Sequence, residues 1–209
     1  MHLLDISKLH RLPFLRCSNL HAGEVVSVTT LFLNRIQEVT QISAGKAKQL
    51  METCVWCLAA SSHVNGISMK VIEGSRSDSY ILSWPDEEIE LEATMRSFNQ
   101  NDATEDGAEA IALLLSIDRT AYTAVERAVT TTGIDYWLGY KDNIDNPFKQ
   151  AGRLEISGIF KENETNTVAA RVKAKLKQTR PTAHTFAVYV VVVEFGQPYA
   201  TMVKNDNGE

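Results

Sequence analysis

Two acidic residues stand in otherwise apolar segments of the second half of the chain and could bind a metal ion. Asp135 lies near the start of residues 133–137, and Glu155 lies in the middle of residues 153–158. An ionised carboxylate in an apolar strand is costly unless it is paired or binds a cation. If the two strands pair, the carboxylates converge, and a hard divalent cation such as Mg²⁺ relieves their repulsion while using oxygen ligands.

The same two residues also have a purely structural interpretation. Glu155 could pair with Arg153 or with a neighbouring lysine on a solvated face of the sheet. Asp135 could cap the turn that follows Thr132 and Gly133. Both interpretations stay open at this point, because a single acid in a strand is compatible with either one.

The elements that must position these acids follow from the hydrophobic pattern of residues 105–203. A helix is expected first, and Ile111, Leu114 and Leu115 contribute to its apolar face. The expected order is a helix over 105–130, strands over 134–141 and 153–160, a helix over 167–179, a strand over 184–195 that is buried on both faces, and a short strand over 199–203.

The direction of the side chains within these elements indicates which residues could share a face with the predicted site. Alternation along strand 153–160 puts Arg153, Glu155 and Ser157 on one face, opposite Leu154 and Ile156. In helix 167–179, at 100° per residue, the buried stripe is Val168, Val172 and Leu176, flanked on one side by Lys173 and Lys177 and on the other by Arg171 and Lys175.

The order of elements and the two acids resemble the PD-(D/E)XK nuclease superfamily, which has the restriction-endonuclease-like fold, over about residues 105–204. Asp135 matches the first acid of its motif, and Glu155 to Ser157 match the second part. The resemblance implies that Asp135 and Glu155 hold Mg²⁺ or Mn²⁺, and that the metal activates water for attack on a phosphodiester bond.

The chain departs from the pattern of that superfamily in two ways, and a third acid has to be assigned. Ser157 stands where the superfamily has a lysine, and Lys173 on the next helix could take its place. A third acid often comes from the first helix, and Glu126, in the last turns of the expected helix, is preferred to Glu109. The pattern also shows no strand between the first helix and the strand that bears Asp135.

Positive charge is local in this chain. The net charge is −5, yet residues 151–180 hold seven basic and three acidic residues. The cationic residues of helix 167–179 could follow a phosphate backbone, with a salt-sensitive contribution from each contact, or form an ordinary solvated helix face. The predicted nucleic-acid-binding residues are Arg171, Lys173, Lys175 and Lys177.

The first hundred residues show structure but no chemistry. Ser43 is expected to cap a helix that runs to about His63, and residues 67–73 and 80–84 are expected to form a hairpin around residues 74–78. A helix over 86–98 and a polar joint over 99–104 follow. This joint predicts a division into a helical and hairpin region, residues 1–100, and a nuclease-like core, residues 101–209, or one continuous domain.

The three cysteines are most simply explained as reduced thiols. Cys54 and Cys57 lie in the expected helix with no second cysteine pair, so they are interpreted as core residues; a metal site would need Cys17 and His63 to join them by folding. Because no apolar run is long enough to span a bilayer and the N-terminus does not match a signal peptide, we expect a cytoplasmic protein with no membrane partner.

These observations together predict an α/β (or α+β) fold with a central mixed sheet flanked by helices. The predicted function is metal-dependent cleavage of DNA, by a homodimer or with a partner subunit, in a prokaryotic DNA-processing or phage-defence system. The alternative is a non-catalytic nucleic-acid-binding or assembly subunit that retains the fold. A catalytic site requires Asp135, Glu155 and a lysine amine to converge, whereas an assembly module requires an exposed apolar patch.

Overall fold

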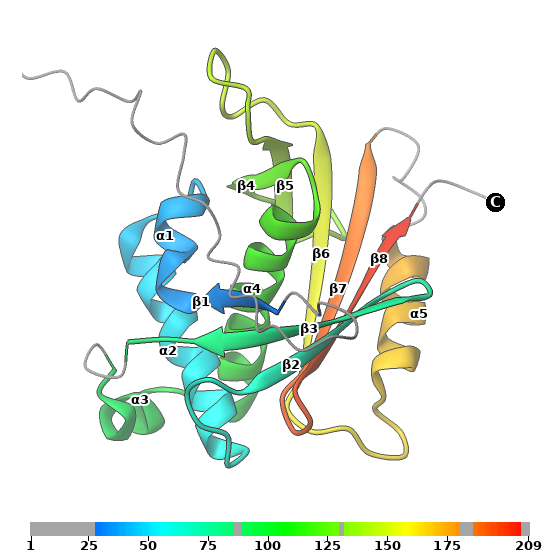
Figure 1. Cartoon of the computed structure of the whole chain (residues 1–209). Coiled ribbons are helices and arrows are strands. Elements are labelled where there is room, and N and C mark those ends of the chain that lie inside the picture. The colour runs from blue at the N-terminus through cyan, green and yellow to red at the C-terminus, as the bar shows by residue number, and fades with distance from the viewer. Residues whose placement is uncertain (1–27, 86–88, 130–131, 180–185, 206–209) are drawn as a thin grey trace, which may run out of the picture.

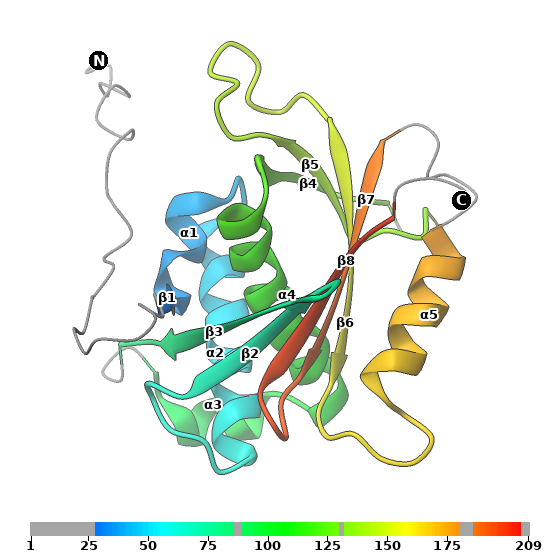
Figure 2. The ribbon, with the colours of Figure 1, turned by 45° about the vertical axis from the view of Figure 1, so that its right-hand side comes forward.

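The computed structural model describes residues 28–85, 89–129, 132–179 and 186–205. One mixed sheet of eight strands, in the order β1-β3-β2-β8-β7-β6-β5-β4, forms the centre of this described part. Helices α2 and α4 cover one face, and α5 lies on the other face (Figures 1 and 2). The predicted α/β class, with a central mixed sheet between helices, is confirmed.

Helices and strands are mixed along both halves of the chain. The first half contains β1 (Thr29–Phe32), the 3₁₀ turn η2 (Leu33–Arg35), α1 (Ile36–Val39), α2 (Ala44–Ala60), β2 (Ser68–Glu73), β3 (Arg76–Ser83) and α3 (Leu91–Ser97). The second half contains α4 (Gln100–Arg119), β4 (Tyr122–Arg127), β5 (Tyr136–Tyr140), β6 (Gly152–Ile159), α5 (Val168–Thr179), β7 (Ala187–Glu194) and β8 (Tyr199–Asn205).

The helix and hairpin predicted in the first half are confirmed. The Ser43 side chain accepts a hydrogen bond from the amide of Lys46 at 3.2 Å, which is the expected cap of α2. Strands β2 and β3 pair in antiparallel fashion, with Glu73 opposite Arg76. The connection is tighter than predicted, because Gly74 adopts a φ of 59° and turns the chain at once.

The long helix predicted over 105–130 is wrong at both ends. Helix α4 begins at Gln100, where the Asn99 side chain accepts a hydrogen bond from the Asp102 amide at 3.0 Å, and it ends at Arg119. The predicted polar joint is therefore the start of α4. Beyond it, β4 pairs with β5 in antiparallel fashion. Thr123 and Val125 are β-branched, and pairing with β5 outweighs the weak helical spacing of this segment.

Strands from both predicted regions share one sheet. Strand β2 pairs with β8 in parallel, with Val71 opposite Ala200, and β3 pairs with β1 on its far side. On the face of the sheet that α2 and α4 cover, these two helices pack directly against each other. Of the helix predicted over 86–98, residues 86–88 lie outside the described residues, and residues 91–97 form the shorter α3, which lies at the end of this layer (Figure 1). Position 100, where a division was predicted, is the first residue of α4.

Strands β6 and β7 run parallel and are connected through α5, so α5 crosses one face of the sheet (Figure 2). Strand β7 is buried on both faces, as predicted. Val191 and Val193 belong to the main core beneath α2 and α4, whereas Val190 and Val192 pack towards Val168 at the start of α5. Residues 184 and 185, at the start of the predicted strand, lie outside the described residues.

Candidate active site

Strand β6 is longer than the strand that pairs with its outer edge. The β5–β6 ladder runs from Leu138 to Tyr136, and the amide of Asp135 donates the last backbone hydrogen bond to the carbonyl of Leu154 at 2.9 Å. Beyond that point β6 continues to Ile159 without a described strand beside it on this edge. Its remaining outward-facing amides therefore need other acceptors.

Two carboxylates supply those acceptors. The amide of Ile156 donates to Oδ2 of Asp135 at 2.7 Å, and the amide of Gly158 donates to Oε2 of Glu105 at 3.3 Å. These amides are two residues apart, so Asp135, from the start of β5, and Glu105, from α4, follow one another along the edge of β6. Partial desolvation raises the pKa of Glu105, against the opposing effects of the Gly158 amide, Lys175 and Arg171, and the negative charge of Asp135 adds a smaller rise.

Glu155 projects from β6 towards α5, next to the same edge. The residue is only 2% exposed, and its Oε1 accepts hydrogen bonds from Nζ of Lys175 and, at 3.1 Å, from Nε2 of Gln178. Burial and, second, the negative charge of Asp135 together raise the pKa of Glu155 from the ordinary 4.5 to about 7, against the opposing effects of Lys175 and Gln178. The two acids of the predicted motif are therefore electrostatic neighbours.

Ser157, which stands where the predicted motif would have a lysine, contacts an arginine. Nη1 of Arg171 donates to Oγ of Ser157 at 3.1 Å, and Nη2 of the same guanidinium donates to Oδ1 of Asn166 at 2.9 Å. Glu155 and Ser157 both face α5, while Leu154 and Ile156 lie in the main core, so the predicted alternation along this strand is confirmed.

The structure brings together most of the predicted site residues and one that the sequence did not reveal. Lys175 contacts Glu155, whereas Lys173 and Lys177 are exposed on the other side of α5. Glu126 lies in β4 rather than in a helix, and its exposed carboxylate accepts a hydrogen bond from Gln150 at 2.9 Å. We call the assembled group the edge site; it consists of Glu105, Asp135, Glu155, Ser157, Arg171 and Lys175.

Glu105 was missed because the sequence pattern placed the end of α4 incorrectly. A helix that continues to residue 130 puts Glu126 in its last turns, which made Glu126 the preferred third acid. If Tyr122–Arg127 is instead a strand, the helix ends earlier and the acids near its N-terminus become the candidates. The β-branched residues Thr123 and Val125 carried that signal.

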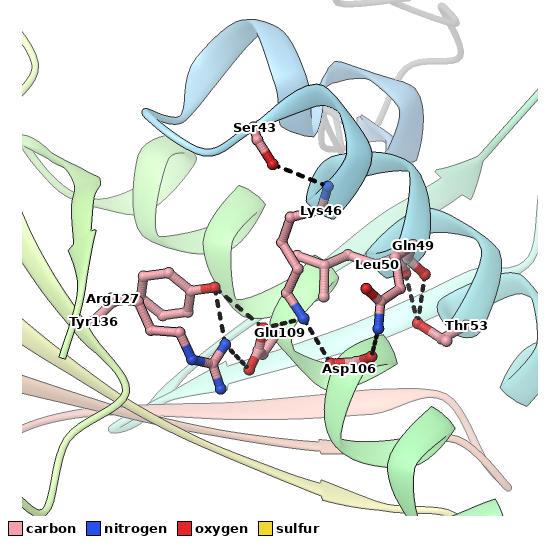
Figure 3. A network of polar contacts seen from close by, with 9 residues as sticks. All are labelled: Ser43, Lys46, Gln49, Leu50, Thr53, Asp106, Glu109, Arg127 and Tyr136. Atoms are coloured by element: carbon pink, nitrogen blue, oxygen red, sulfur yellow. Dashed lines mark hydrogen bonds and ion pairs between the residues drawn. The ribbon is translucent and has the colours of Figure 1, made fainter. Parts of the chain in front are cut away.

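Glu109, the other acid considered, lies in a separate buried network (Figure 3). Its carboxylate contacts Nη1 of Arg127 at 2.7 Å, the hydroxyl of Tyr136 at 3.1 Å and Nζ of Lys46 at 3.4 Å. Glu109 is one helical turn beyond Glu105, and Tyr136 directly follows Asp135. The network therefore fixes α4 against β5 and, with them, the relative position of the two acids on the edge of β6.

The oxygen donors of the edge site are of the kind that Mg²⁺ and Mn²⁺ prefer. Within the described ranges, however, no group of three or more His, Cys, Asp or Glu side chains is placed to hold a metal ion. The ammonium group of Lys175 supplies the positive charge against Glu155. The carboxylate oxygens of Asp135 and Glu155 fit a divalent cation. In the structure, the ammonium group of Lys175 balances the negative charge of Glu155.

The cysteine pair of α2 is part of the core, as predicted. Cys54 and Cys57 are both fully buried, and Sγ of Cys57 donates to the carbonyl of Ala103 at 3.3 Å. Burial raises the pKa of Cys57 to about 12 and also raises that of Cys54. Nε2 of His63 lies 3.1 Å from the carbonyl of Phe195. Cys17, the other residue considered for a metal site, lies outside the described residues.

Comparison of the chain with protein-family models, with curated proteins and with solved structures gives no match. None of the helices described is both long enough and apolar enough to cross a bilayer. Any function must therefore be argued from the edge site itself.

Proposed function

We propose that this protein hydrolyses phosphodiester bonds in DNA with a divalent metal ion, and that the edge site is its active site. The observation that carries the proposal is that Asp135 and Glu155 are electrostatic neighbours, with the ammonium group of Lys175 on Glu155 and with Glu105 next along the same edge of β6, where no described strand pairs with it. Three acids and two cations along one short stretch of strand are more than any one of these acids needs for a structural role, and clusters that contain raised pKa values are typical of active sites.

The order of elements also supports the proposal. The chain runs α4, β4, β5, β6, α5 and β7, with β6 and β7 parallel and the other neighbouring strands of this series antiparallel. The strand between the first helix and the acid-bearing strand, which the sequence pattern lacked, is β4. The resemblance to PD-(D/E)XK nucleases therefore has one fewer departure than the sequence alone suggested.

Five of the six side chains of the edge site have a role in this proposal. Glu155, with a pKa of about 7, gives up its proton near neutral pH and then offers a full negative charge together with Asp135. A divalent metal bound there would supply Lewis-acid activation of water. Lys175 and Arg171 neutralise the phosphate, and Ser157 orients Arg171 rather than acting on the substrate.

The exposed side of α5 supports binding to DNA. Lys173 and Lys177 are both exposed on this helix, one turn apart, and they lie on the opposite side from Lys175. Charges in that position can contact phosphates along a strand without entering the edge site. The proposed role of Lys173 is therefore a salt-sensitive backbone contact and not replacement of the missing lysine.

A second candidate is a non-catalytic assembly or nucleic-acid-binding subunit. It is favoured by three apolar side chains at and after the end of β5: Tyr140, Ile144 and Phe148 are 50%, 68% and 60% exposed. They lie on or beside the long connection from β5 to β6, which projects from the sheet (Figure 1). Exposed apolar side chains on one surface segment are typical of a contact surface for another protein.

The deciding experiment measures cleavage of supercoiled and linear DNA while Mg²⁺ or Mn²⁺ is titrated. We expect metal-dependent cleavage by the wild type, and a loss of at least about a hundredfold in rate for Asp135→Asn and Glu155→Gln. The matched control is Glu126→Gln, an exposed acid outside the edge site, which should cleave at the wild-type rate. Absence of cleavage by the folded wild type with either metal would overturn the proposal and favour the assembly subunit.

A further inference from the structure

A polar pocket adjoins the edge site where β6 ends. Its volume is about 290 Å³, and it is lined by the first turn of α4, by the end of β6 with the turn that follows, and by the start of α5. The pocket shares Glu105 and Arg171 with the edge site. A molecule bound in the edge site could therefore contact the pocket through these two shared residues. We call it the α4–α5 pocket.

The cations of this pocket are available for an anion. Arg171 is held by two neutral oxygen atoms, on Ser157 and Asn166, which use two of its five N–H groups. Lys161 is exposed in the turn after β6 and lines the same pocket. Among the residues that the structure describes, no carboxylate lies within 4 Å of either cationic group. A phosphate is the anion that a fixed guanidinium fork and a nearby lysine recognise best.

The uncharged lining is rich in carboxamides. The side chains of Gln100 and Asn101 project from the first turn of α4, and that of Asn163 comes from the turn after β6. Gln100 and Asn101 are exposed, and in the described part of the chain their side chains make no hydrogen bond. Carboxamides donate and accept at once, which suits the edges of nucleobases.

We propose that the α4–α5 pocket binds one nucleotide of a nucleic-acid strand, with its phosphate on Lys161 and Arg171 and its base against Gln100 and Asn101. This inference rests on the proposed function, because it extends a strand that passes through the edge site by one nucleotide. It implies that the enzyme prefers a substrate in which that nucleotide is unpaired. A base held in a duplex cannot present its pairing edge to carboxamides.

Binding of a mononucleotide tests the pocket without requiring catalysis. The probes are a deoxynucleoside 5′-monophosphate, the same nucleoside without phosphate and inorganic phosphate, each titrated into ¹⁵N-labelled full-length protein with no metal added. We expect amide shifts at Gln100, Asn101 and Lys161 with the nucleotide, and weaker binding of either fragment alone. We expect Lys161→Gln and Asn101→Ala each to weaken nucleotide binding by about tenfold.

The matched control is Lys48→Gln, which removes an exposed lysine of α2 outside the pocket and should leave nucleotide binding unchanged. Absence of binding at millimolar nucleotide, or equal weakening by Lys48→Gln, would overturn the inference. Binding that is lost in Lys161→Gln when the wild type cleaves no DNA would retain the pocket and refute the nuclease proposal. If Lys161→Gln and Asn101→Ala leave DNA cleavage unaffected and the protein binds no nucleotide, the nucleotide-binding inference is refuted and the nuclease proposal is retained.

Discussion

The charge of Glu155 should make the folded protein less stable as the pH rises. The pKa of this carboxyl is about 7 in the folded state and about 4.5 when it is exposed, so between these values the folded state holds a proton that the unfolded state has lost. A raised folded-state pKa contributes stability that is fully present below pH 4.5 and is lost as the pH passes 7. Glu155→Gln removes this titration while keeping the shape of the side chain.

The size of the effect follows from the shift. Each pKa unit corresponds to about 1.4 kcal/mol, so ionised Glu155 lowers the free energy of unfolding by up to about 3 kcal/mol well above pH 7. At pH 5 the loss is about 1 kcal/mol. The difference in stability between Glu155→Gln and the wild type should therefore grow by about 2 kcal/mol from pH 5 to pH 8.

Urea unfolding at pH 5, 6, 7 and 8 measures this difference, and subtracting the wild-type curve cancels every group that both proteins share. Glu126→Gln, which removes an exposed acid, is the control and should show no such growth with pH. A difference that stays constant, or that favours the wild type more at pH 8, would show that Lys175 holds Glu155 in its charged form. The burial and repulsion assigned to the edge site would then be incorrect.

The remaining predictions concern the same site and the core. Asp135→Asn should lower the pKa of Glu155, because a repelling charge is removed; a ¹³C NMR titration that finds it unchanged would exclude their proximity. Gly158→Ala should lower the free energy of unfolding by about 1–3 kcal/mol, since the added carbon would lie 2.3 Å from a backbone oxygen of α4. Gly45→Ala, where nothing lies within 4 Å, should be neutral or slightly stabilising in the same urea assay. In a variant without the third cysteine, the two buried thiols of α2 should react with a thiol reagent at least about a hundredfold more slowly than in urea.

The sequence predicted those elements whose local pattern and tertiary role agree. Strand β6 and helix α5 were predicted almost to their ends, because alternation in one and a four-residue apolar spacing in the other match the surfaces they bury. Strand β4 was missed because its residues fit a helix nearly as well, and its pairing with β5 decides the outcome. The choice between strand and helix here depends on the neighbouring strand, which the local sequence pattern does not show.

The candidate site was predicted in part for a similar reason. The pattern of α5 separated Lys173 and Lys177 from Arg171 and Lys175, on either side of the apolar stripe. It did not reveal which side faces β6, because that depends on how the helix rotates about its axis as Val168 packs on Val190 and Val192. The structure places Arg171 and Lys175 over the edge site.

The position of β8 within the sheet has a consequence for folding. This strand lies between β7 and β2, and its parallel pairing joins Lys70 to Tyr199, two residues far apart in the chain. Closing so long a loop is entropically costly and must occur before β2 and β8 are each paired on both edges. Folding should therefore be slow and largely all-or-none. A population that lacks this pairing would expose the edge of β2 and be prone to aggregation.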